Sequence, residues 1–248
     1  MIKQFLRIAL LLFAAILTPL LVLAGSIADA DALYEQGGTV NLFNAINMCE
    51  TFLEKSPENF EGNWKCARAC REYGENAKKS NYDGWEQICA EYGKKGMKYA
   101  SKAKALDPNH PAGYYFYGLN AGIYSDGTSI ITAVKEGLKN KTQSSFEKVY
   151  ELDKAYEEAG AILALGRFWA VLPWPLYDKK KALNYYREFQ QTEYFQSSIE
   201  GRVYLSELLI ALGGDRNKAE AKDLLTQSVQ AGEPYFRNWA QRLLDKIR

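Results

Sequence analysis

Two stretches, FEGNWKCARACREYG at residues 60–74 and PAGYYFYGLNAG at residues 111–122, each begin three positions after a proline, Pro57 and Pro108. Aligned on those prolines, the two stretches carry bulky and small residues at matching points of a helix, namely Cys66-Ala67 with Tyr117-Gly118, and Cys70 with Ala121. A small residue on a helix lets a second helix approach closely. We therefore predict that each stretch is the first helix of a helical pair.

The same order of residues continues on both sides of these stretches. Before the two prolines, an apolar or small face indicates the second helix of a pair, with Ala45, Cys49 and Phe52 in one unit and Ala100 and Ala103 in the next. The pattern recurs more loosely further on: Ile162, Leu165-Gly166 and Trp169; Ala182, Tyr186 and Phe189; Tyr204, Leu208-Leu209 and Leu212; Ala221, Leu225 and Val229. No stretch alternates like a strand. The pattern predicts one all-α, tetratricopeptide-like (TPR-like) solenoid over residues 25–248, with about five degenerate helix pairs and a closing helix, Pro234 to Arg248.

The N-terminus has the pattern of an export signal. A short basic segment precedes the apolar run from Ile8 to Ala24, and Val22-Leu23-Ala24 has the small or aliphatic character of a cleavage site before Gly25. The alternative is an uncleaved membrane anchor, because an apolar run of about 17 residues is at the lower limit for spanning a bilayer. We expect residues 1–24 to be a signal peptide and the chain to be exported, to a bacterial periplasm, or to be membrane-anchored if the signal stays.

All four cysteines lie between residues 49 and 89. Export would allow them to form disulfides. Cys49 and Cys66 lie at similar distances from the turn near Pro57, and Cys70 and Cys89 lie in the same way around Asn81, so we favour the pairs Cys49–Cys66 and Cys70–Cys89. The alternative is that all four are free, buried, small apolar residues. Their spacing does not match that of a zinc ribbon or finger.

Charge and motifs argue against several classes of protein. A formal net charge of +1, from 31 basic and 30 acidic residues, gives no reason to expect a nucleic-acid partner. A nucleophile-elbow serine, a metal-binding His pair and a phosphate-binding loop are all missing from the sequence. The only histidine, His110, belongs to a turn, and Glu157-Glu158 lies near a helix start, where the dipole favours carboxylates. We expect no enzymatic activity, no metal and no cofactor.

Aromatic residues provide the candidate binding site. Tyr114 to Tyr117 are four aromatics in succession on one helix, and successive helical residues point about 100° apart, so they do not all enter one core face. Further aromatics surround the Pro173-Trp174-Pro175 corner, which ends a helix because proline disfavours helix at itself and just before itself. Trp174 either covers the end of the helical pair or anchors a partner. The candidate ligand- or partner-binding residues are Tyr114, Tyr115, Tyr117, Trp169, Trp174 and Tyr177.

Four short segments in order give the chain a family resemblance: Ala164 to Arg167, Leu172 to Pro175, Lys181 to Leu183, and Gly214-Asp215. In this order and spacing the chain resembles the TatT family, the periplasmic TPR component associated with TRAP transporters. The resemblance implies a protein partner, a TRAP-type periplasmic solute-binding protein, and a small apolar or organic-acid ligand that is bound or handed over. Family members are often lipoproteins, and this chain lacks the modified cysteine. The alternative function is a general TPR scaffold for an envelope assembly, and a homo-oligomer is compatible with both.

Overall fold

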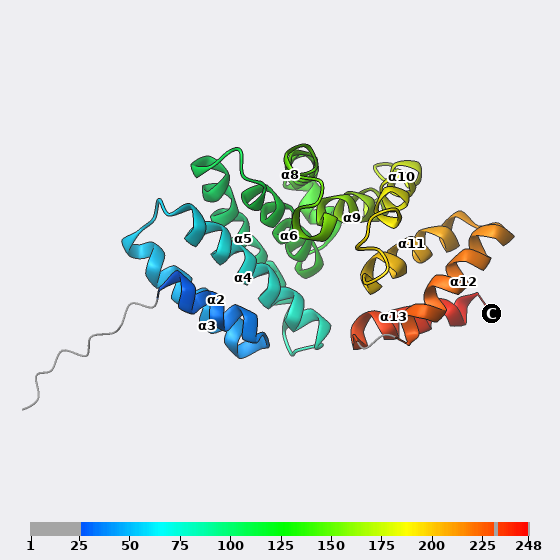
Figure 1. The fold of residues 1–248 in the computed structure, drawn as a ribbon, viewed down its shortest axis with the longest axis horizontal. Coiled ribbons are helices and arrows are strands. Elements are labelled where there is room, and N and C mark those ends of the chain that lie inside the picture. The colour runs from blue at the N-terminus through cyan, green and yellow to red at the C-terminus, as the bar shows by residue number, and fades with distance from the viewer. Residues whose placement is uncertain (1–25, 231–232, 248) are drawn as a thin grey trace, which may run out of the picture.

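The computed structural model describes residues 26–230 and 233–247, and within them the chain forms twelve helices and no strand (Figure 1). The helices are α2 Ile27–Gln36, α3 Thr39–Lys55, α4 Phe60–Lys79, α5 Trp85–Leu106, α6 Pro111–Gly127, α7 Ile130–Lys135, α8 Leu138–Leu152, α9 Tyr156–Val171, α10 Lys179–Gln190, α11 Ile199–Leu212, α12 Asp215–Val229 and α13 Pro234–Lys246. The predicted signal or anchor at residues 1–24 lies outside the described part. No helix within that part is long and apolar enough to cross a membrane.

The helices pack in sequence order as five pairs and a closing helix. The pairs are α2 with α3, α4 with α5, α6 with α8, α9 with α10, and α11 with α12, and α13 packs on α12 and α11. The short helix α7 occupies the longer connection inside the third pair. The prediction of an all-α, TPR-like solenoid is therefore confirmed.

Local residues account for where the helices begin. The Asn59 side chain caps α4 by accepting a hydrogen bond from the Gly62 amide at 2.6 Å. His110 caps α6 in the same way, since its Nδ1 accepts from the Ala112 amide at 3.2 Å, and Pro111 follows at the first helical position. A side-chain acceptor at this position satisfies an amide that has no partner inside the helix. His110 is thus the turn residue that the sequence indicates.

Glycines allow the close approach of helices within two pairs. A Cβ added at Gly118 of α6 would lie 2.4 Å from the ring of Phe146 on α8, and one at Gly166 of α9 would lie 2.5 Å from the ring of Tyr186 on α10. In each pair, an aromatic ring of the second helix therefore occupies the space that a side chain at the glycine of the first helix would take. These contacts match the repeat register that places small residues at both positions.

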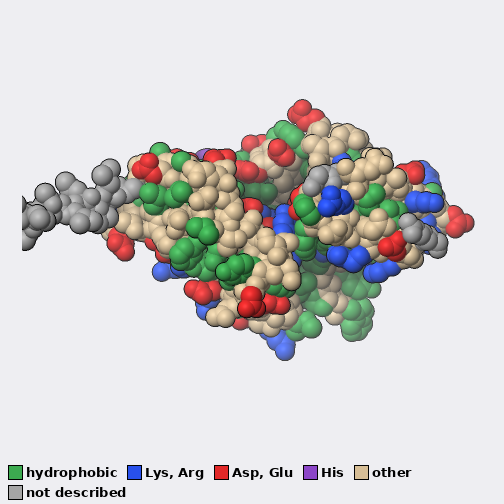
Figure 2. Space-filling view, turned by 90° about the horizontal axis from the view of Figure 1, so that it is seen from below, with side chains coloured by type: hydrophobic (Ala, Val, Ile, Leu, Met, Phe, Trp, Pro, Cys, Tyr) green, Lys and Arg blue, Asp and Glu red, His purple; other side chains and the backbone are tan. Residues whose placement is uncertain are grey.

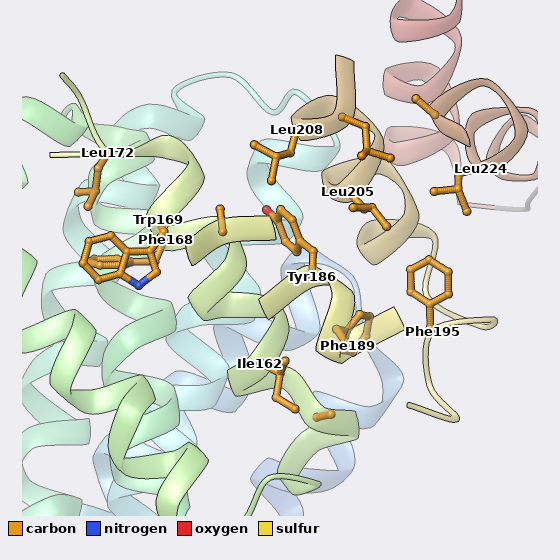
Figure 3. Packing of buried hydrophobic residues seen from close by; sticks show 14 residues of the cluster. Ile162, Phe168, Trp169, Leu172, Tyr186, Phe189, Phe195, Leu205, Leu208 and Leu224 are labelled. Atoms are coloured by element: carbon orange, nitrogen blue, oxygen red, sulfur yellow. The ribbon is translucent and has the colours of Figure 1, made fainter. Parts of the chain in front are cut away.

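The largest apolar cluster joins four helices of the C-terminal half. Figure 3 shows it running from Trp169 and Leu172 of α9 and its corner, through Tyr186 of α10, to Leu205 of α11 and Leu224 of α12. Tyr186 and Leu205 are completely or almost completely buried. Because each helix pair contributes to the cluster of the next, the C-terminal half is stabilised as one continuous stack.

The four cysteines are buried and free, so the favoured pairs Cys49–Cys66 and Cys70–Cys89 are not formed. The turn at Pro57 does bring Cys49 beside Cys66, but Cys70 lies close to the Cys66 thiol as well. The Cys89 thiol instead donates to the carbonyl oxygen of Gly74 at 3.3 Å, one helical turn beyond Cys70. The cysteines act as small core residues between α3, α4 and α5, which was the alternative.

We expect the native protein to resist thiol alkylation and the denatured protein to expose four thiols without any reductant. Burial raises the pKa of the Cys66 thiol, and mainly burial raises the pKa of Cys89 to about 12, so the reactive thiolate is scarce at neutral pH. Intact mass after alkylation, with and without denaturant, gives the number of alkylated cysteines in the denatured and in the native protein. Fewer than four alkylated cysteines in the denatured, unreduced protein would show that disulfides form after all.

Candidate functional site

The solenoid curves into an arch in which the lower end of α4 lies opposite α13 (Figure 1). The C-terminal end of α4 meets the start of α13, where the Lys79 ammonium lies 5.1 Å from the centre of the Phe236 ring. A cavity of about 280 Å³ lies inside the arch and is lined by residues of α4, α6, α7, α8, α9, α11 and α13. The view from below shows Lys and Arg side chains where the two halves of the molecule meet (Figure 2).

One part of this cavity is apolar. Six of the residues that form it come from α6, α7, α8 and α9: Leu119, Ile123, Val134, Phe146, Leu163 and Phe168. Gly122 on α6 also lines the cavity, and a Cβ added there would meet no atom within 4 Å. The cavity therefore has space beside α6 for an apolar group of a bound molecule.

The α4 wall of the cavity carries charged side chains that pair with one another. Arg71 lies 2.9 Å from a carboxylate oxygen of Glu72 and 3.6 Å from one of Glu75, and Lys79 lies 3.3 Å from the other oxygen of Glu75. Burial by itself raises the pKa of the Glu75 carboxyl group, but the charges of Arg71 and Lys79 outweigh this effect and lower the pKa to about 2. Glu75 is thus a buried carboxylate that stays ionised at neutral pH.

The opposite wall presents one arginine between aromatic rings. The Arg167 guanidinium of α9 donates to Glu207 of α11 at 2.6 Å and lies 4.4 Å from the centre of the Tyr204 ring and 5.2 Å from that of Trp239. Tyr204 belongs to α11 and Trp239 to α13, so this arginine ties three helices together. Its guanidinium, paired with Glu207, thus belongs to the lining of the cavity.

A second cavity of about 250 Å³ continues from the first and is more polar. The two cavities share six lining residues, Arg71, Tyr115, Leu119, Gly160, Leu163 and Glu200, so we treat them as one central groove. Arg68 and Glu158 line only the second cavity. The Nε atoms of Arg68 and Arg71 are buried and have no hydrogen-bond partner among the described residues. Both arginines line the second cavity, with side chains that are 15% and 20% exposed, so the groove presents two guanidinium groups to a bound molecule.

Glu157 and Glu158 reach the second cavity through an unusual backbone. Both residues and Ala159 have positive φ values, between 48° and 59°, so they precede the regular part of α9 in the left-handed region. The sequence places the two carboxylates near a helix start. In the structure they do lie at the start of α9, but their backbone does not have the conformation of a regular first turn. Burial is the main cause that raises the pKa of Glu157. Such backbone is costly for residues other than glycine, and it is typical of binding sites.

The six predicted site residues lie in three different surroundings. Tyr115 lines both cavities of the central groove, and its ring packs against those of Phe146 and Tyr156. Tyr117 and Trp169 are buried in core clusters. Tyr114 lies beside Tyr117 under the Lys104 ammonium, at 5.5 Å and 3.8 Å from the two ring centres.

Trp174 and Tyr177 are exposed by 80% and 42% on the corner between α9 and α10. Neither of them lines the central groove. The structure therefore brings Tyr115 into the groove and leaves the other five outside it. The charged groove residues Arg71, Glu75, Arg167 and Glu200 were not among the predicted ones. In the sequence these residues are charged positions among small or apolar ones on a helix. A charged residue that faces solvent gives the same pattern, so the sequence does not distinguish the two.

Comparison with known proteins gives a family and a fold. The family described as "RMD1-3: Regulator of microtubule dynamics protein 1-3" matches residues 26–170, more than half of the chain. The crystal structure of a thermophilic TPR protein of Thermus thermophilus is similar, with a TM-score of 0.59 and 16% sequence identity. That similarity covers 88% of this chain and 96% of the Thermus protein, so it shows a shared fold. No curated protein sequence matches this chain.

Proposed function

Since the chain belongs to the family of regulator of microtubule dynamics proteins 1–3 and has the fold of a TPR protein, we propose that it is a non-enzymatic scaffold that binds a protein partner in its central groove. TPR-like folds expose a concave surface for binding, formed by the stacking of their repeats. The family's description speaks of microtubule dynamics, a role of the named proteins 1–3. The part proposed for this chain is the protein-binding scaffold.

The combination of apolar space and arginine side chains in one groove supports this proposal. Next to Gly122 the groove has space for an apolar side chain, and Arg68 and Arg71 line the groove with side chains that are 15% and 20% exposed. Guanidinium groups form charge-assisted hydrogen bonds with carboxylate acceptors. A partner segment with an apolar side chain and nearby carbonyl or carboxylate oxygens has the required groups.

The specific partner implied by the TatT resemblance, a TRAP-type solute-binding protein, stays a prediction, and so does the handing over of a small apolar or organic-acid ligand. The groove is compatible with such a ligand because its apolar side lies close to Arg71 and Arg167. Export through residues 1–24 is part of the same proposal. A general TPR scaffold for an envelope assembly uses the same groove without a small ligand.

We expect Gly122→Phe to weaken partner binding about tenfold or more, because its ring fills the space that an apolar group of the partner would enter. The melting temperature should stay close to that of the unmodified protein, since nothing lies within 4 Å of the added Cβ. Gly122→Ala is the matched control, because it adds only a methyl group at the same site. Calorimetric titration with a purified TRAP-type solute-binding protein measures the affinity of all three proteins.

Photo-cross-linking tests the scaffold independently of that choice of partner. A benzophenone attached at Gly122→Cys reports on the groove, and one at Lys94→Cys reports on an exposed position of α5 that lines neither cavity. We expect a discrete protein adduct from the groove position only. Equal adducts from both positions, or none from the groove, would contradict the scaffold. A groove adduct with a different protein would reject only the TRAP-type partner.

A further inference from the structure

The corner between α9 and α10 combines exposed aromatic rings with a run of lysines. Trp174 is the most exposed large apolar side chain among the described residues, at 80%, and Tyr177 follows three residues later. Lys179, Lys180 and Lys181 then form the first turn of α10. We propose that this corner docks on the surface of an anionic lipid bilayer, a binding site separate from the central groove.

Backbone hydrogen bonds and a buried neighbour hold the corner in a defined shape. The Asp178 amide donates to the carbonyl oxygen of Trp169 at 3.0 Å, and the Leu176 amide donates to that of Pro173 at 2.7 Å. Leu172, just before the corner, is buried in the main apolar cluster. Trp174 therefore stays outside because the chain on both sides of it is fixed to the core.

Lysines from two helices surround this corner. The Lys181 ammonium lies 4.2 Å from the centre of the Trp169 ring, and that of Lys139 on α8 lies 5.4 Å from the same ring. Lys179 lies 5.9 Å from the Tyr177 ring. Asp178 is the one acidic residue between Trp174 and Tyr186, and its carboxylate caps the helix through the Lys181 amide at 2.9 Å. The local charge is thus positive although the whole chain is nearly neutral.

The position of these lysines is unfavourable for the dipole of α10. The N-terminal end of a helix carries a partial positive charge, so three lysines in the first turn of α10 oppose the dipole and one another. Other helices in the described part begin with acidic residues, for example Glu61 in α4 and Glu200 in α11. Lys179 and Lys181 have local partners, the Ala211 carbonyl oxygen at 3.1 Å and the Asp178 carboxylate at 3.9 Å. Lys180 has none among the described residues, so local contacts do not account for all three lysines.

The chemistry of the corner favours lipid over an acidic protein. Protein interfaces are enriched in arginine and depleted in lysine, whereas the cations that lie over the rings of Trp169 and Tyr177 are lysines. Tryptophan and tyrosine are enriched at membrane–water interfaces, where the ring lies among the headgroups. Each lysine close to an anionic leaflet adds to the attraction, and flexible lysine stems reach headgroups without a shaped pocket.

A fluorescent label at the corner tests the proposal in the full-length chain. Since all four native cysteines are buried, Tyr177→Cys can be labelled selectively with an environment-sensitive thiol dye, and Lys94→Cys on α5 provides the control position. With vesicles of phosphatidylcholine and phosphatidylglycerol in equal parts, we expect a blue shift at position 177 only. Vesicles of phosphatidylcholine alone should leave both labels unchanged.

Two further variants connect the signal to the named residues. Lys180→Gln combined with Lys181→Gln should weaken vesicle binding about fivefold for each lysine. Its melting temperature should change little, because relief of the helix dipole offsets the loss of the Lys181 contacts with Trp169 and Asp178. Lys94→Gln combined with Lys98→Gln, which removes two exposed lysines of α5, should bind like the unmodified protein. No shift at position 177, an equal shift with neutral vesicles, or unchanged binding after loss of both corner lysines would overturn the proposal, and the first of these would favour an acidic protein as partner.

Discussion

Replacement of Gly118 by leucine is expected to lower the stability of the protein by about 1 to 3 kcal/mol, because the core has no space for the new side chain. A single Cβ at this position would already lie 2.4 Å from the ring of Phe146, which is itself buried. Phe146 belongs to α8, the second helix of the same pair, so relief requires α6 and α8 to move apart. For a chain of this size the change corresponds to a fall in melting temperature of roughly 3 to 10 °C.

The matched control lies one helical turn further along the same helix. Gly122→Ala places its Cβ in open space and replaces a poor helix former by the best one, so its melting temperature should stay the same or rise slightly. Thermal unfolding followed by circular dichroism compares the three proteins. If Gly118→Leu melted like the unmodified protein, the assigned packing of α6 against α8 would be wrong.

Replacement of Glu75 by glutamine is expected to cost about 3 kcal/mol at neutral pH, because it removes the charge partner of Arg71 and Lys79 from a buried site. Glu75 is only 8% exposed, so solvent screens these pairs weakly. The lowered pKa leads to the same size of effect, since a fall from 4.5 to about 2 corresponds to about 3 kcal/mol. The agreement arises because both figures describe the same ionised carboxylate among the same cations.

The dependence on pH follows from the direction of that shift. A carboxyl group whose pKa is lower in the folded state stabilises the fold above its unfolded pKa and loses this effect as the pH falls through the folded value. We therefore expect the difference between the unmodified protein and Glu75→Gln to be largest at pH 7 and to shrink between about pH 4.5 and pH 2. Urea unfolding at several pH values measures it.

Glu72→Gln is the control for this second prediction. Glu72 bonds to the same Arg71 but its side chain is 33% exposed, so its loss should cost less than about 1 kcal/mol. A cost for Glu72→Gln as large as that for Glu75→Gln would show that burial of the pair is unimportant. A difference between Glu75→Gln and the unmodified protein that does not change with pH would contradict the low pKa.

The helical pairs could be predicted because their signals are local. The prolines at positions 57 and 108, and the glycines at positions 118 and 166, mark turns and close contacts between neighbours in the chain, and the structure contains both contacts. The cysteine pairing depended on the same turns, and its first half was nearly right in space: Cys49 does lie beside Cys66. Its chemistry was wrong, because distance along two helices says nothing about whether a bond forms.

The binding site depends on more distant relations. Arg167 lies between rings of Tyr204 and Trp239, and Lys79 meets Phe236, so the groove exists only where helices far apart in the sequence come together. Of the aromatic residues that the sequence selects as candidate binding residues, Tyr115 lines the groove, whereas Tyr117 and Trp169 are buried in core clusters. A helix has the same pattern of aromatic residues whether these residues pack against another helix or line an open groove.

The sequence by itself determined that this protein is a stack of helix pairs, because small residues and helix caps act between neighbouring positions and are readable one repeat at a time. Only the tertiary structure decided that the stack curves until α4 meets α13, and with it which charged side chains face one another across the groove. Small rotations between successive pairs add up along the chain. The curvature therefore depends on all the interfaces together, whereas each pair depends mainly on its own residues.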